Sequence, residues 1–135
     1  MAKNETQPDD FADYYGGLIP LEDIYTLTER LVTAIEENEY YKEYCRLKKE
    51  VDKDMELKHK LNHFKKAKFA LDYNRNSGKA TDFDEERYVS ALYSKLVVND
   101  IAARYLECEG KVLGLVFRIN ETIGSRIKMD LEFME

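Results

Sequence analysis

The chain has 135 residues, of which 44% are apolar and 36% charged, a balance typical of one folded domain with a sizeable core rather than of a disordered protein. No apolar run approaches the roughly 18 residues of a membrane span, and no secretory signal is visible at the N-terminus. The two cysteines lie far apart in the sequence, so we expect reduced thiols in a cytoplasmic protein.

The net charge of −6 conceals an uneven distribution. Residues 42–79 hold twelve Lys and Arg against six Asp and Glu, a balance of +6, whereas the remaining residues hold nine against twenty-one, a balance of −12. The basic segment could bind RNA or an acidic partner, or it could pair with acidic residues of the same molecule or of a second copy. We favour pairing, because an overall negative charge opposes binding to nucleic acid. RNA binding through residues 42–79 is the alternative.

The first helix follows a polar, acidic stretch. We predict that residues 1–19 form a partly disordered tail and that residues 20–135 form one helical domain. Pro20 suits the first turn of a helix, and the acids Glu22 and Asp23 suit its positive end. The apolar spacing then predicts a helix to about Glu37, with one face formed by Leu21, Ile24, Thr28, Leu31 and Ile35.

A second helix is predicted from about Tyr40 to Val51. Its apolar positions are Tyr40, Tyr41, Tyr44, Leu47 and Val51. A basic stripe follows the same helix and consists of Lys42, Arg46, Lys49 and Lys53. Such a stripe is ordinarily a solvated face, and the sharper alternative is a surface that binds an acidic partner or phosphate.

The third and fourth helices are separated by a turn. Asp52 or Asp54 can cap the third helix, whose apolar face is Leu57, Leu61, Phe64, Ala67 and Leu71. The segment from Asn74 to Gly78 contains asparagine and glycine residues typical of a helix end, so we predict that the third helix ends there in a turn. Asp82, with Glu85 three residues later, resembles a capping box for a fourth helix with Val89, Leu92, Tyr93 and Leu96 on its inner face.

The last helix is predicted from Asn99 to Met129, with Asn99 as its N-cap. Its main apolar stripe is Ile101, Tyr105, Cys108, Val112, Leu115 and Ile119. A second line, formed by Leu106, Leu113 and Phe117, lies roughly 120° around the helix from the first. Gly110 lies near this second line, and glycine inside a helix suggests close approach by another backbone. We therefore predict self-association into a dimer or higher oligomer through Leu106, Gly110, Leu113 and Phe117; the alternative is one wide core face.

No strand pattern of useful length is present, so the predicted fold is all-α. We expect an elongated bundle of about five helices. The third and fifth helices would form a long antiparallel hairpin, with the fourth as a connector.

The sequence offers little catalytic chemistry. Glu56, His59 and His63 could share one helix face as metal ligands, but a di-iron bundle needs a second such motif and the chain has no other histidine. Cys108 lies on the main stripe and is expected to be buried and inert, and Cys45 partly buried. No nucleophile elbow, phosphate loop or dinucleotide fingerprint is present. We expect no catalytic residue, no metal and no cofactor.

The last helix opens with Asn99-Asp100-Ile101-Ala102-Ala103-Arg104-Tyr105-Leu106-Glu107-Cys108-Glu109, followed later by Ile119 and Ile123-Gly124. This looks like the signature of the YlbF/YmcA family of bacterial helical proteins: Asn-Asp, an aromatic residue, an acidic-alanine step and a run of leucines. Phe64 to Lys68, Gly78, and Tyr88 with Leu92 and Leu96 fit the same pattern upstream. The resemblance covers about Leu21 to Ile127 and rests mostly on hydrophobic spacing. Where the family often has alanine, this chain has Cys108.

The resemblance implies a regulatory function. Members of the family are cytoplasmic proteins of Gram-positive bacteria, linked to competence, biofilm formation and sporulation, and some assist messenger RNA maturation by the ribonuclease RNase Y. They have no catalytic residues of their own. Some carry a cysteine-rich C-terminal tail that contributes to an iron–sulfur cluster; we expect neither such a tail after Phe133-Met134-Glu135 nor a bound cluster in this chain. We therefore expect a non-enzymatic adaptor that acts through helix-face contacts with other regulatory proteins.

Overall fold

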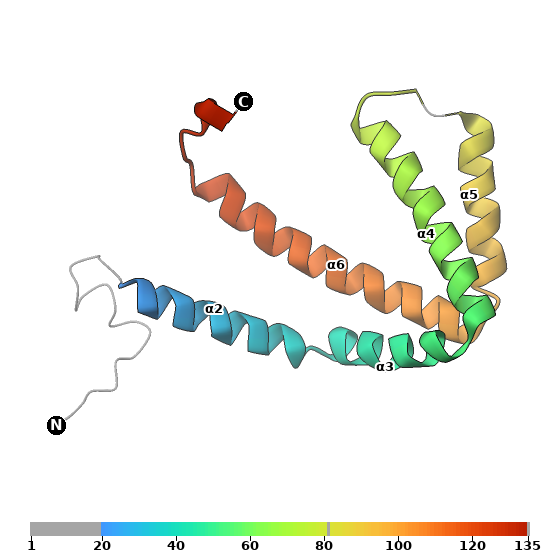
Figure 1. The fold of residues 1–135 in the computed structure, drawn as a ribbon, viewed down its shortest axis with the longest axis horizontal. Coiled ribbons are helices and arrows are strands. Elements are labelled where there is room, and N and C mark those ends of the chain that lie inside the picture. The colour runs from blue at the N-terminus through green and yellow to red at the C-terminus, as the bar shows by residue number, and fades with distance from the viewer. Residues whose placement is uncertain (1–19, 81, 135) are drawn as a thin grey trace. The chain divides into compact units, whose positions relative to one another are not determined.

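The computed structural model describes residues 20–80 and 82–134, and within these ranges it is all-α, as predicted (Figure 1). The helices are α2 (Leu21–Glu36), α3 (Glu39–Lys53), α4 (Met55–Asn76), α5 (Phe83–Leu96) and α6 (Asp100–Arg126), with a short 3-10 helix, η1 (Glu132–Met134). None of the helices in this part of the chain is both long enough and apolar enough to cross a bilayer. The predicted tail of residues 1–19 lies outside the described residues.

The helix ends follow the local sequence chemistry. The side chain of Asp54 accepts a hydrogen bond from the backbone N–H of Leu57 at 3.1 Å, and Asn99 accepts one from Ala102 at 3.0 Å. Both residues therefore cap helices as predicted. Asp82 caps α5 through the N–H of Asp84, a bond one residue earlier than a capping box with Glu85 would use.

The stop at the end of α4 is a glycine-terminated cap. Gly78 has φ +80°, a backbone conformation that glycine adopts without steric cost. The N–H of Lys79 donates to the carbonyl of Asn74, and the N–H of Gly78 donates to that of Arg75, which is the pair of bonds of a Schellman motif. The predicted stop between Asn74 and Gly78 is confirmed. The last helix begins as predicted but ends at Arg126 rather than Met129.

The chain forms two compact units, one up to Asn38 and one from Glu39 onward. The first unit contributes α2 to the described residues. No residue of α2 is buried among the described residues, and of its predicted apolar face only Ile35 is half-buried. The boundaries of the predicted helical domain, residues 20–135, stay a prediction.

The core belongs to the second unit. It lies where α3 leads into α4 and α5 leads into α6, so that all four helices contribute to it (Figure 1). A single residue, Asp54, separates α3 from α4, and three residues separate α5 from α6, which brings both bends to the same end. The buried residues of this cluster are Leu47, Val51, Leu57, Leu61, Phe64, Leu96, Ala102, Tyr105 and Cys108.

The pairing of the helices differs from the predicted hairpin of the third and fifth helices. α6 packs most extensively along α3, and α4 packs along α5 (Figure 1). The physical reason lies in α3, whose Leu47 and Val51 are buried in the same cluster as Tyr105 and Cys108 of α6. α4 joins α6 only near the core, and the two helices then diverge (Figure 1).

Candidate functional site

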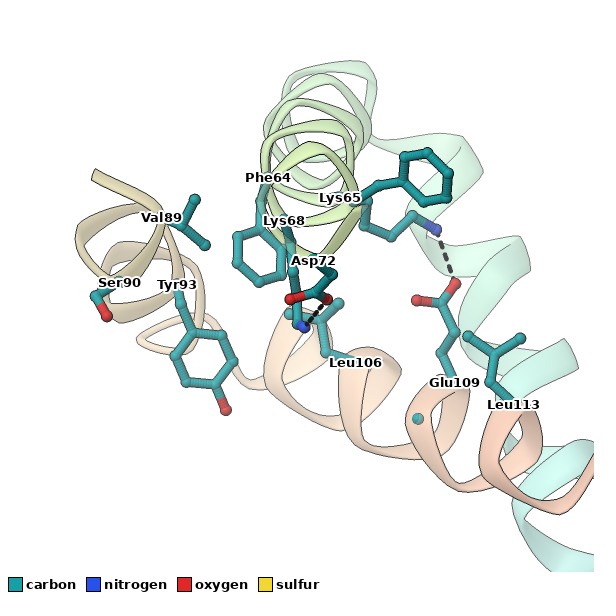
Figure 2. A pocket seen from close by; sticks show the side chains of 12 residues that line it. Phe64, Lys65, Lys68, Asp72, Val89, Ser90, Tyr93, Leu106, Glu109 and Leu113 are labelled. Atoms are coloured by element: carbon teal, nitrogen blue, oxygen red, sulfur yellow. Dashed lines mark hydrogen bonds and ion pairs between the residues drawn. The ribbon is translucent and has the colours of Figure 1, made fainter. Parts of the chain in front are cut away.

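A groove opens between α4, α5 and α6, where these helices diverge from the core, with a volume of about 760 Å³. Its walls are mostly apolar, and Figure 2 shows that the side chains come from all three helices. The apolar and aromatic lining residues are Phe64 and Phe69 of α4, Val89 and Tyr93 of α5, and Leu106 and Leu113 of α6. An open apolar groove of this kind suits a helix or another apolar surface.

The charged residues of the groove pair with one another. Lys65 Nζ lies 2.7 Å from Glu109 Oε2, and Lys68 Nζ lies 2.7 Å from Asp72 Oδ2 (dashed lines in Figure 2). These two cations and two anions are the charged members of the lining. The groove therefore has no net charge, and its chemistry favours an uncharged occupant.

A polar network ties the groove to the core beneath it. Lys65 Nζ donates to Tyr105 Oη at 3.0 Å, and Tyr105 Oη donates to Glu109 Oε2 at 3.2 Å. The ring of Tyr105 stacks on Tyr44 of α3 at a centroid distance of 5.4 Å. Burial, followed by the hydrogen bond with Tyr105, raises the pKa of Tyr44 to about 12. Burial also raises the pKa of Tyr105. Both phenols therefore stay neutral well above physiological pH.

The predicted self-association face meets this groove. Leu106, Gly110 and Leu113 line it, and Phe117 lies one helical turn beyond Leu113 on α6. Leu106 is half-buried against the core, whereas Leu113 and Phe117 are 63% and 65% exposed. A Cβ placed on Gly110 would meet nothing within 4 Å. The described residues thus make no close backbone approach at this glycine, and self-association stays a prediction.

The predicted basic surface on α3 is partly neutralised. Arg46 donates to both carboxylate oxygens of Glu43, at 2.8 and 2.9 Å, and Lys53 lies 3.4 Å from Glu50. Lys42 and Lys49 form no ion pair with a described residue.

The same pairing extends along residues 42–79. Eight of the twelve cations in this segment form ion pairs, six of them with acids of the segment itself. The other two reach Glu109 and Glu86. Among the described residues, only these two pairs join the basic segment to acidic residues elsewhere in the chain, so its pairing with the acidic segments stays a prediction.

The candidate metal ligands on α4 have other partners. His63 Nε2 lies 2.6 Å from Tyr88 Oη of α5, with the two rings edge to face. Glu56 lies 3.7 Å from Lys60. No group of three or more His, Cys, Asp or Glu residues in the described part of the chain is placed to hold a metal ion. The sequence did not predict the hydrogen bond between His63 and Tyr88, because the two residues are 25 positions apart and share no motif.

The cysteines lie as predicted. Cys108 is fully buried, and Cys45 is half-buried. Burial raises the pKa of the Cys108 thiol, which disfavours the reactive thiolate. This residue is confirmed as a part of the core.

The wall that α4 contributes to the groove was also missed. Phe69 is 71% exposed and lines the groove, yet it lies out of phase with the apolar stripe of α4. A large aromatic residue off the core stripe was the available signal, since a core helix has no need of one there.

Comparison with known proteins places the chain among regulatory proteins. The family described as "Control of competence regulator ComK, YlbF/YmcA" matches residues 24–128. A UPF0342 protein of Caldicellulosiruptor bescii is 25% identical over 108 residues, covering 80% of this chain and 91% of the relative. A UPF0342 protein of Caldicellulosiruptor saccharolyticus is 22% identical over 109 residues, covering 81% and 91%. No solved structure shows a significant match. With the family pattern running from α2 to the end of α6, the chain belongs to the YlbF/YmcA family, whose described role is control of the competence regulator ComK.

Proposed function

We propose that this protein is a non-enzymatic regulatory adaptor that acts through helix-face contacts, with a homo-oligomer as its working unit. One observation carries the proposal: Leu113 and Phe117 are 63% and 65% exposed on a helix whose first half is built into the core. Covering a large apolar side chain contributes about 1.5–3 kcal/mol. Two neighbouring side chains of this size, beside an apolar groove, therefore favour a protein partner.

The processes in which the adaptor acts follow from the family. Its description supports a role in control of competence. The resemblance extends the proposal to biofilm formation, sporulation and RNase Y-dependent messenger RNA maturation in the cytoplasm of Gram-positive bacteria. Other regulatory proteins would be its partners. Lys42 and Lys49 on α3, which form no ion pair with a described residue, are available to an acidic partner on a surface separate from the groove.

Direct RNA binding is the weaker reading of the basic segment. Phosphate binding depends on free Lys and Arg side chains, and most of those in residues 42–79 are already ion-paired. RNA would then be reached indirectly, through a partner protein.

A matched pair of substitutions in the native host tests the adaptor function. Leu113→Glu places a charge on the proposed face, and Ile123→Glu places one on the same helix at a residue that is 54% exposed. Ile123 lies about 80° around the helix from Leu113. At equal protein levels, we expect Leu113→Glu to lower transformation frequency toward that of a deletion strain and Ile123→Glu to keep it near wild type. Full complementation by Leu113→Glu would contradict the proposed face.

A further inference from the structure

We propose that the groove between α4, α5 and α6 binds α6 of a second copy, so that two copies form a dimer through crossed, antiparallel α6 helices. This inference rests on the proposed function, because it names the partner of the same face. It goes further in assigning α4 and α5 to the interface. The self-association face by itself requires only α6.

The groove and the strip that would enter it share residues. Leu106, Gly110 and Leu113 line one wall, and they continue along α6 to the exposed Phe117. In a twofold interface the same patch serves both copies. A second α6 that crosses near Gly110 would therefore place its own Leu113 and Phe117 in the groove while it offers its own groove in return.

The glycines of α6 provide room for the crossing. A Cβ at Gly110 or at Gly114 would meet nothing within 4 Å, so the backbone is open on that side of the helix. Small residues at a crossing point allow two helices to approach closely. The open space next to Gly110 lies on the groove side, since Gly110 is itself a lining residue.

The charges of α6 specify the antiparallel direction. Residues 100–110 of the helix hold Asp100, Glu107 and Glu109 against Arg104, and Lys65 of α4 offsets Glu109, which leaves a balance of −1. Residues 111–126 hold Lys111, Arg118 and Arg126 against Glu121, a balance of +2. An antiparallel pair brings the acidic half of each copy beside the basic half of the other, whereas a parallel pair aligns like charges.

The neutrality of the groove fits this occupant. Its two lysines are held by Glu109 and Asp72, so no free charge is left to attract a charged ligand. The incoming strip, Leu113, Gly114 and Phe117, is likewise uncharged. The net charges of the two helix halves lie outside this strip, where they act on orientation.

Substitutions in the α4 and α5 walls of the groove test this inference. These walls lie outside α6, so the substitutions leave the self-association face itself unchanged. Phe69→Glu changes a groove residue that is 71% exposed, and Phe83→Glu is the matched control, 68% exposed at the start of α5 and outside the groove. Ser90→Arg on the α5 wall, with Ser94→Arg as its control outside the groove, is a second pair. All four side chains are exposed, so each variant is expected to fold, as circular dichroism would verify.

Sedimentation equilibrium of each full-length variant then measures the dimer dissociation constant. We expect Phe69→Glu and Ser90→Arg to raise it at least tenfold, because each would bury a charge without a partner. The two controls should leave it unchanged. If Leu113→Glu dissociates the dimer while both groove-wall variants remain dimeric, α6 pairs away from the groove and the inference fails, although the proposed function survives. A wild-type protein that is monomeric would overturn both.

Discussion

The two halves of α6 carry similar apolar patterning, but only the first half is buried by the other helices. In the first half, Ala102, Tyr105 and Cys108 are buried among α3, α4 and α5. In the second half, Val112, Leu115 and Ile119 continue the same stripe but are only half-buried, and Leu113 and Phe117 are exposed. The period of a helix thus shows which residues face the same way, but it does not show whether the chain itself covers them.

The largest expected effect contrasts a covered leucine with an uncovered one. Leu61 is 1% exposed in the core and Leu113 is 63% exposed on α6. We expect Leu61→Ala to lower the free energy of unfolding by about 2–5 kcal/mol, since a cavity remains. Leu113→Ala should change the free energy of unfolding of the monomer by less than about 0.5 kcal/mol. Urea unfolding at protein concentrations that dissociate the dimer measures both, and equal losses would place Leu113 in the monomer core.

High pH should lower the folding stability that Tyr44 of α3 contributes where it packs against the buried first half of α6. The folded pKa of Tyr44 is about 12, above the value of roughly 10 for an unfolded tyrosine. The folded state therefore holds the phenolic proton more tightly, and this contribution to stability is complete below pH 10 and is lost as pH rises through about 12. Thermal melts between these pH values should fall less steeply for Tyr44→Phe than for wild type. Tyr73→Phe, on a residue that is 60% exposed, is the control and should follow wild type.

The rate of thiol labelling reports how readily the buried first half of α6 opens. In a Cys45→Ala background, Cys108 is the sole thiol, and it is fully buried. We expect it to react at least about a hundredfold more slowly in the native protein than in urea, since labelling requires an opening of the core. Labelling with a chromogenic disulfide reagent, followed by absorbance, gives both rates. Comparable rates would mean that the first half of α6 opens readily.

The smallest expected effect is that of metal removal. His63 is engaged with Tyr88 at 2.6 Å, and Glu56, His59 and His63 were the only ligand combination that the sequence offered. We expect elemental analysis to find no stoichiometric iron or zinc, and chelators to leave the melting temperature unchanged. About one metal ion per chain, lost in His63→Ala, would contradict this.

The sequence predicted each helix of the second unit and the buried face of α4, where Leu57, Leu61, Phe64 and Leu71 are all buried. These features depend on short-range spacing and on caps such as Asp54 and Asn99, which act within a few residues. The pairing of α6 with α3 was not predicted, because a helical stripe does not specify its partner. The α4 and α5 walls of the groove were missed for the same reason: Phe69, Tyr93 and Leu113 come together only once the helices are placed.

Sedimentation equilibrium of the wild-type protein beside Leu113→Glu tests whether the exposed face of α6 holds two copies together. We expect a wild-type dimer at tens of micromolar, a range suited to a modest interface. Leu113→Glu should be a monomer with its helical circular dichroism intact, because residue 113 is exposed within one chain. A wild-type monomer at that concentration would show that this face does not mediate self-association. A Leu113→Glu protein that unfolds would show instead that the exposed half of α6 is needed for the fold itself.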